Sequence, residues 1–143
     1  REVARLLAAR DFSSRDLRSV ELSSADLAGL KAVDALLRDA RFRNANLRCA
    51  DFTRANLSNA HLAGADLSGA SFRDADLEGA DFTSANLRGA DFRGASLFGA
   101  SLYTDGAPEA KIDAATRFSA ATLDQLTPAQ AEFLRASGAT IEP

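Results

Sequence analysis

The sequence predicts an all-β solenoid, a coil of short strands, on the basis of three observations. Thirteen consecutive pentapeptides begin with Ala, from Ala40 to Ala100. Each has Leu or Phe at its third place, from Phe42 to Leu102, with a polar residue between the two. Eight of the thirteen end in Gly or Asn, which turn the backbone readily. We expect the 143 residues to form a single domain, 1–143, around this array.

The five-residue period excludes the other regular structures. In an α-helix, five residues rotate the chain by about 500°, so the Leu and Phe side chains would form no stripe. In one long strand, an odd period sends the apolar residues to alternate faces. A short strand followed by a corner fits, because the first and third places then point to one side. Such units bury their apolar side chains only by winding into a coil and stacking.

The fifth place of each pentapeptide is expected to be the corner. A type II turn requires positive φ at this place, which favours Gly and Asn. The remaining five repeats end in residues that tolerate positive φ less well, so the sequence predicts other turn types there. These residues are Cys49, Arg54, Asp74, Ser84 and Thr104.

The motif Ala-(Asp/Asn)-(Leu/Phe)-x-x, as in Ala65-Asp66-Leu67-Ser68-Gly69, resembles the motif of the pentapeptide repeat family. The resemblance covers residues 40–104 densely and residues 10–29 more loosely. It implies a right-handed quadrilateral β-helix with four pentapeptides per coil. Residues twenty apart are then expected to stack at about 4.8 Å. One predicted internal column is Phe52, Phe72 and Phe92.

The N-terminal flank is expected to cap the coil and to begin it. Residues 1–9 are predicted to form a short α-helical cap, because Val3, Leu6 and Leu7 share one helical face. Residues 10–29 form a first, less regular coil. Residues 30–39 lose the pattern and have no Gly, Asn or Pro to mark a corner. Their composition favours a helical insertion that leaves the coil, and two degenerate repeats are the alternative.

After the regular repeats of residues 40–104, residues 105–143 are predicted to form a loop and a short α-helical cap. Thr127 as N-cap, Pro128 at the first helical position and Gln130 at the third predict a helix over 128–137. Gly138 is suited to end it. The apolar residues expected to cover this end of the coil are Phe118, Leu123, Leu126, Phe133 and Leu134.

The sequence indicates no catalytic, cofactor or metal site. His61, the one histidine, lies at an outward place with Asp81 one coil above. A His–Asp pair can act as a base and its orienting group, so an enzyme using this pair is one alternative function. The flat side of a solenoid, which offers no cleft, argues against it. Cys49 is interpreted as an unreactive surface thiol, and a single Cys excludes an internal disulfide.

We expect a non-catalytic scaffold that presents a rigid surface to a protein partner of unknown identity. The candidate surface residues are Arg48, Arg73, Arg88, Arg93, Phe98 and Tyr103. The family resemblance also implies an alternative, a DNA mimic that binds type II topoisomerases such as gyrase and confers quinolone resistance. Between residues 40 and 104, however, seven Arg offset six Asp and one Glu. Imitation of a duplex requires excess negative charge.

The remaining expectations concern partners and location. The net charge of −3 indicates neither direct nucleic-acid binding nor a membrane surface. No stretch is long and apolar enough to span a bilayer, and no secretory signal is visible. We therefore expect a soluble protein, either a monomer or an end-to-end dimer. Its compartment is unknown, and the start without Met leaves open a removed leader or a longer parent chain.

Overall fold

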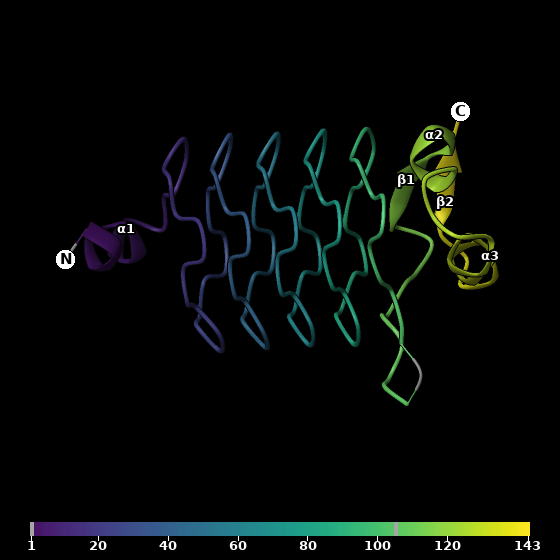
Figure 1. Cartoon of the computed structure of the whole chain (residues 1–143), viewed down its shortest axis with the longest axis horizontal. Helices are drawn as coiled ribbons and strands as arrows, with labels where there is room; N and C mark the ends of the chain where they lie inside the picture. The colour runs from purple at the N-terminus through teal and green to yellow at the C-terminus, as the bar shows by residue number, and fades with distance from the viewer. Residues whose placement is uncertain (1, 105) are drawn as a thin grey trace.

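The computed structural model describes residues 2–104 and 106–143. A stack of rungs lies between helix α1 (Glu2–Ala9) at one end and four short elements at the other. These are β1 (Arg117–Ser119), α2 (Ala120–Leu123), α3 (Pro128–Ala136) and β2 (Thr140–Glu142). Figure 1 shows the two termini at opposite ends of the stack. Residues 1 and 105, which belong to the predicted cap helix and C-terminal loop, lie outside the described part.

Each turn of the coil takes twenty residues and has four sides. Parallel bridges recur every five residues and join positions twenty apart, from Asp11↔Lys31 to Asp81↔Ser101. The repeat at Ala65 shows the bonding pattern. Asp66 N–H donates to Ala45 O below it, and Leu67 N–H donates to Asn86 O above it, both at 2.9 Å. The N–H of Ala70 then closes the corner on Leu67 O at 3.0 Å.

We name the four sides by one bridge-forming residue of each. The Asp51 side carries Asp11, Lys31, Asp51, Ser71, Asp91 and Arg117. The Asn56 side carries Asp16, Leu36, Asn56, Asp76 and Ser96. The His61 side carries Glu21, Arg41, His61, Asp81 and Ser101. The Asp66 side carries Asp26, Asn46, Asp66, Asn86 and Lys111.

The first and third places fill the interior, as the pattern predicts. Every first-place Ala from Ala40 to Ala100 and every third-place Leu or Phe from Phe42 to Leu102 is buried. The Phe72 ring stacks between those of Phe52 and Phe92, with centroids 5.2 and 4.9 Å away. Phe118 of β1 extends this column, at 4.8 Å from Phe92. The predicted aromatic column is confirmed and is one layer longer than expected.

The predicted helical insertion at residues 30–39 is wrong. Lys31 pairs with both Asp11 and Asp51, and Leu36 pairs with Asp16 and Asn56, so this segment is two further repeats of the coil. Leu30, Ala32, Ala35 and Leu37 are buried. Lys31 N–H donates to Arg10 O and Leu36 N–H to Arg15 O, each at 2.9 Å, so the backbone groups of this segment are satisfied by the coil below rather than within a helix. Phe12 consequently lies beneath Ala32, because bridged positions are twenty residues apart.

The corners are more uniform than the sequence predicts. Gly69 and Gly89 have φ of 71° and 73°, as expected. Cys49, Arg54, Asp74 and Ser84 also have positive φ, between 57° and 64°, where other turns were predicted. Backbone N–H groups explain this at three of them: Cys49 N–H donates to Ser68 O and Arg54 N–H to Arg73 O, each at 2.9 Å, and Asp74 N–H donates to Arg93 O at 3.1 Å. Bonding between coils therefore imposes the positive-φ corner conformation on the backbone, even where the residue is not Gly or Asn.

Both predicted cap helices form. Helix α1 buries Leu6 and partly buries Val3 and Leu7 against the first coil. Thr127 caps α3, since its Oγ1 accepts a hydrogen bond from Gln130 N at 3.2 Å. Gly138, with φ of 87°, follows the last turn.

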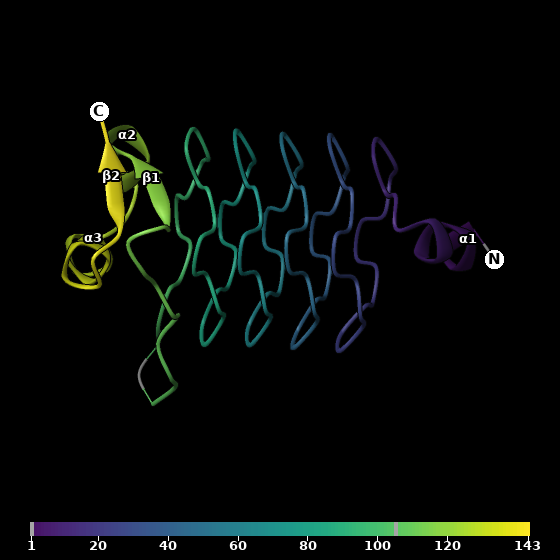
Figure 2. The same ribbon diagram turned by 180° about the vertical axis from the view of Figure 1, so that it is seen from behind.

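The C-terminal segment also continues the coil, which the sequence did not predict. Lys111 pairs with Asn86 and Arg117 with Asp91, so extra residues between the rungs form a projecting loop. Strand β2 then pairs in parallel with β1, and both views show α3 beyond the last rung (Figures 1 and 2). The predicted covering residues are confirmed, with Phe118, Leu123, Leu126 and Leu134 buried and Phe133 partly buried.

Side chains of this segment form hydrogen bonds with backbone groups of the last coil that a further rung would otherwise satisfy. Gln125 Oε1 accepts from Leu97 N at 2.6 Å, and Gln130 Oε1 accepts from Leu102 N at 2.9 Å. Thr122 Oγ1 donates to Ala95 O at 3.0 Å. The open strand edge that would otherwise attract another chain is thereby closed at these points.

Candidate interaction surface

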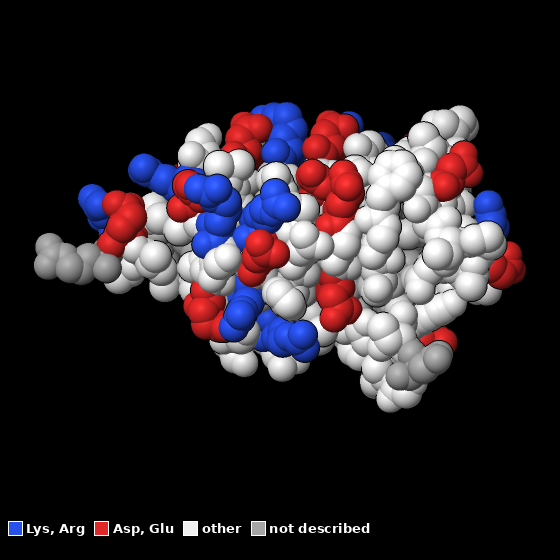
Figure 3. Space-filling model, in the orientation of Figure 1, with Lys and Arg blue, Asp and Glu red and all other residues white. Residues whose placement is uncertain are grey.

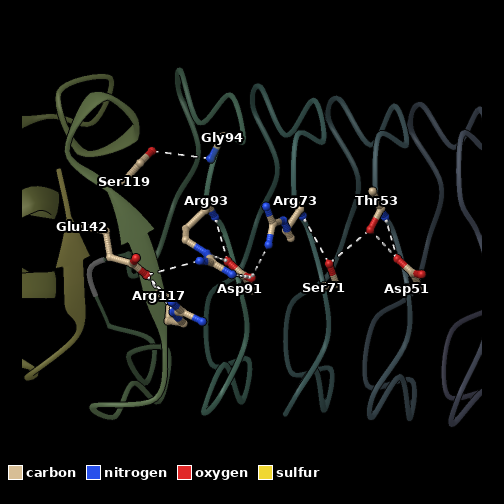
Figure 4. Close-up of polar contacts among 10 residues, drawn as sticks. All are labelled: Asp51, Thr53, Ser71, Arg73, Asp91, Arg93, Gly94, Arg117, Ser119 and Glu142. Atoms are coloured by element: carbon tan, nitrogen blue, oxygen red, sulfur yellow. Dashed lines mark hydrogen bonds and ion pairs between the residues drawn. The ribbon is translucent and has the colours of Figure 1, made fainter.

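Arg73 and Arg93, two of the predicted surface residues, lie on the Asp51 side within a polar ladder (Figure 4). Arg93 holds the Asp91 carboxylate with two hydrogen bonds, of 2.9 and 2.7 Å. The Arg73 guanidinium is 3.9 Å from the same carboxylate. Burial raises the pKa of Asp91, but the hydrogen bonds from Arg93 outweigh it, so the pKa lies below its usual value. Both arginines are therefore engaged within the protein.

The same ladder fastens the C-terminal strand to the coil. Glu142 of β2 accepts from Arg117 Nε at 2.8 Å, and its carboxylate is 3.6 Å from the guanidinium of Arg93. Further along the ladder, Thr53 Oγ1 lies 3.2 Å from Ser71 Oγ. Figure 4 shows these groups following one another across the rungs. These ion pairs hold β2 against the Asp51 side, and we call the contacts of Glu142 with Arg93 and Arg117 the clamp.

Arg48 and Arg88 lie on another side of the coil. Both are exposed at the fourth place of the Asp66 side, with the repeat of Ser68 between them. Their backbone N–H groups donate to Asn46 and Asn86 at 3.2 Å. The four predicted arginines are thus divided between two adjacent sides.

The two predicted aromatic residues are also separated. Tyr103, on the His61 side, is partly covered by Phe133, with ring centroids 5.2 Å apart. Phe98, on the Asn56 side, is 55% exposed. Leu36 occupies the second place on that same side and is 43% exposed. The sequence reasoning missed Leu36 because it placed residues 30–39 outside the coil; an apolar residue at an otherwise polar place is the signal that could have found it.

A hollow of about 370 Å³ lies on the Asn56 side next to Phe98. Arg38 lines one end and Phe98 the other. Its floor and walls are Asn56, Ser58, Asn59, Asp76, Glu78, Gly79 and Gly99. The hollow arises because short side chains in the middle coils lie between an arginine and a phenylalanine. A molecule bound in this hollow would meet a cation, two carboxylates and an aromatic ring.

His61 and Asp81 are neighbours on one ladder but do not form a catalytic pair. No hydrogen bond or ion pair joins them in the described part of the chain; Asp81 Oδ1 instead accepts from Thr83 N at 2.9 Å. The hollow on this side is lined by Asp81 but not by His61. The geometry needed for a base and its orienting group is not present.

The described residues contain no group of three or more His, Cys, Asp or Glu placed to hold a metal ion. Cys49 is an exposed free thiol. Within residues 2–104 and 106–143, no helix has the length and apolar character needed to cross a membrane.

Charges of both signs share the surface. Figure 3 shows Lys and Arg gathered over the rungs nearer α1, with acidic residues interleaved, and few charges toward the C-terminal end of this face. The visible face carries no continuous acidic stripe.

Comparison with known proteins gives a family but no curated counterpart. The family model for pentapeptide repeats matches in eight copies, over residues 21–59, 35–74 and 75–103. No curated protein matches the chain. The matching model describes a structural repeat, and no enzyme family is indicated.

Several solved structures are similar. The pentapeptide repeat protein alr5209 from Nostoc Pcc 7120 is 28% identical, with 99% of this chain and 93% of that chain covered and a TM-score of 0.52. HetL, a pentapeptide repeat protein involved in heterocyst differentiation regulation in Nostoc sp. strain PCC 7120, is 32% identical. That match covers 82% of this chain and 56% of HetL, with a TM-score of 0.47.

The fluoroquinolone resistance protein QnrB1 is 21% identical, with 87% of this chain and 66% of that chain covered and a TM-score of 0.29. The family assignment rests on the repeat model, whose matches extend from residue 21 to residue 103, more than half of the chain. The protein belongs to the pentapeptide repeat family.

Proposed function

We propose that this protein is a non-catalytic scaffold, a right-handed four-sided β-helix as the family resemblance implies, that binds a protein partner on its Asn56 side. One observation carries the proposal. The two large apolar side chains that are exposed in the described residues, Leu36 and Phe98, lie on this one side. Phe98 lines the hollow there, together with Arg38, which follows Leu36 by two residues. Exposed aromatic residues beside polar groups are typical of binding surfaces.

The Asp51 side supports this choice by contrast, because its arginines already have partners within the protein. On the Asp51 side, Arg73 and Arg93 are engaged by Asp91 and the side is crossed by the clamp to Glu142. The balanced charges also disfavour the gyrase-binding DNA mimic, because that function requires an acidic surface. The partner is therefore expected to bring apolar contacts for Leu36 and Phe98, with hydrogen-bond donors for Asp76 and Glu78 between them.

Site-specific photo-crosslinking in cells of the source organism tests this proposal. A benzophenone amino acid replaces Phe98 in one variant and Arg88 in a matched control, which also lies at an exposed fourth place but on the Asp66 side. We expect a discrete protein adduct from position 98 only, and its loss when Leu36→Ser is added. Equal adducts from both positions, or an adduct that persists with Leu36→Ser, would contradict the proposal.

A further inference from the structure

A second hollow, of about 370 Å³, lies on the His61 side under the loop that interrupts the coil. Below this loop, bridged residues are twenty apart, whereas Asn86 pairs with Lys111. The extra residues project from the side of the stack (Figure 1), and Thr104 and Ala107 form a wall of the hollow. Ser84 Oγ donates to Pro108 O at 2.9 Å and ties the loop to the coil. The loop gives an otherwise flat side a concave site.

Small residues in the middle coil form the floor. Ala63 lies twenty residues from Arg43 and from Thr83, and the adjacent Gly64 lies between Asn44 and Ser84 in the next column. With a rise of about 4.8 Å per coil, Arg43 and Thr83 are separated by about 10 Å along the axis. The short Ala63 side chain leaves that interval open.

Thr83 departs from the hydrogen-bonding pattern of three other fourth-place hydroxyls. Thr53, Ser58 and Ser68 each donate through their hydroxyl to Oδ1 of the residue two before, at 2.5, 2.8 and 2.7 Å. Thr83 is only 7% exposed, and its Oγ1 has no hydrogen-bond partner among the described residues. A buried hydroxyl without a partner is costly and rare, so the Thr83 hydroxyl retains an unused capacity to bond a polar group of a ligand.

Two opposite charges complete the site. Arg43 lines one end, is exposed, and forms no ion pair with the described acidic residues. Asp81 lines the other end, and the one hydrogen bond its carboxylate accepts in the described chain comes from Thr83 N. A ligand that carries a negative and a positive group on a short framework matches this order of charges.

We propose that the hollow binds a small zwitterion of the amino-acid class. Its carboxylate would lie toward Arg43 and Asn44, and its ammonium group toward Asp81 and the Thr83 hydroxyl. A volume of about 370 Å³ is at the small end of ligand pockets, which suits such a molecule. The site lies on a different side from Leu36 and Phe98 and is independent of the proposed protein-binding function.

The test is calorimetric titration of the whole protein with each of the common free L-amino acids and with their N-acetylated, C-amidated forms. We expect saturable binding of at least one free amino acid and none of its blocked form. Arg43→Gln and Thr83→Val should each weaken binding about tenfold or more, the effect of one charge-assisted hydrogen bond. Ala63→Leu should abolish binding by filling the floor.

Two controls separate binding from folding. Thr83→Val removes a hydroxyl that has no partner in the fold, so its melting temperature should not fall. Ser68→Leu adds the same bulk at the fourth place of the Asp66 side and should leave binding unchanged. The proposal is overturned if no amino acid binds at millimolar concentration, if the blocked forms bind as tightly, or if Ala63→Leu binds like the wild type. Leu36→Ser should not affect this binding, whatever its effect on the protein partner.

Discussion

From Asn44 to Gly99, the residue at the fifth place of every repeat has φ between 57° and 76°, whatever its side chain. For a residue other than Gly, this conformation costs about 1–2 kcal/mol. The chain accepts that cost at Cys49, Arg54 and Asp74, because the N–H of each corner donates to a carbonyl of the coil above. Corner residues therefore differ in strain although they share one geometry.

Gly69→Val tests the corner geometry. Its φ is 71°, and a Cβ added there would lie 3.3 Å from Cys49 Sγ. We expect a loss of more than about 1 kcal/mol in the free energy of unfolding, because a β-branched residue is strained at positive φ. Gly69→Asn, which tolerates this conformation, should lose clearly less in the same urea denaturation series. Equal losses would place the effect in the contact with Cys49 rather than in the backbone.

Phe72→Ala tests the division between inside and outside. The ring contacts Phe52, Phe82 and Phe92, with centroids 4.9 to 5.8 Å away, so its loss leaves a cavity in the aromatic column. We expect a cost of about 3–5 kcal/mol. Asp76→Ala should be near neutral, within about 0.5 kcal/mol, since it loses one exposed hydrogen bond from Glu78 N. Thermal unfolding of the two variants with similar midpoints would show the assignment to be wrong.

Among the elements, the C-terminal segment does the most to end the coil, because its side chains replace the bonds of a further rung. Gln130 lies in the first turn of α3 and accepts from Leu102 N, while Gln125 accepts from Leu97 N. Helix α3 is thus held in place by polar contacts as well as by the burial of Leu134.

Gln130→Ala should cost about 1–3 kcal/mol, because Leu102 N–H loses its acceptor at a partly buried position. Gln130→Glu keeps an acceptor oxygen and should retain most of the stability. Hydrogen exchange of the Leu102 amide checks the mechanism directly. Faster exchange in Gln130→Ala alone is expected, and unchanged protection in both variants would refute the capping role.

The clamp between β2 and the Asp51 side predicts a sensitivity to acid. Because the pKa of Asp91 is lowered in the folded state, this group contributes stability above its unfolded pKa of about 4 and loses it as the pH falls through the lower folded pKa. Asp91→Asn should therefore be less stable than wild type at pH 7, and the difference should shrink as the pH falls below about 4. Exposed Asp124→Asn serves as the control in the same melting series. A constant difference at every pH would exclude this linkage.

At the scale of the whole molecule, the two ends of the stack are covered by different numbers of elements. At the C-terminal end, four short elements cover the core and close strand edges, whereas α1 alone lies at the other end (Figure 1). Removing the C-terminal cover would expose Leu97 and Leu102 together with their free N–H groups. Such an edge templates pairing between molecules.

Truncation after Tyr103 is therefore expected to drive self-association while the circular dichroism remains largely that of β-structure. Sedimentation velocity over a range of concentrations measures the association. A truncated chain that stays monomeric and equally stable would make the C-terminal segment a dispensable appendage rather than a cap. Whether the intact protein is a monomer or an end-to-end dimer stays a prediction that the same experiment addresses.

The sequence by itself determined the five-residue unit, its inward and outward places and the start of α3 at Thr127. Each of these depends on residues within a few positions of one another, so the pattern is readable locally. The tertiary structure decided that residues 30–39 remain in the coil, that Cys49 and Arg54 turn like glycine, and that Leu36 lies on the side of Phe98. It also decided the loop that makes a hollow above Ala63. These features depend on bonds between residues about twenty or more apart, whose gain outweighs local preference and is invisible in any single pentapeptide.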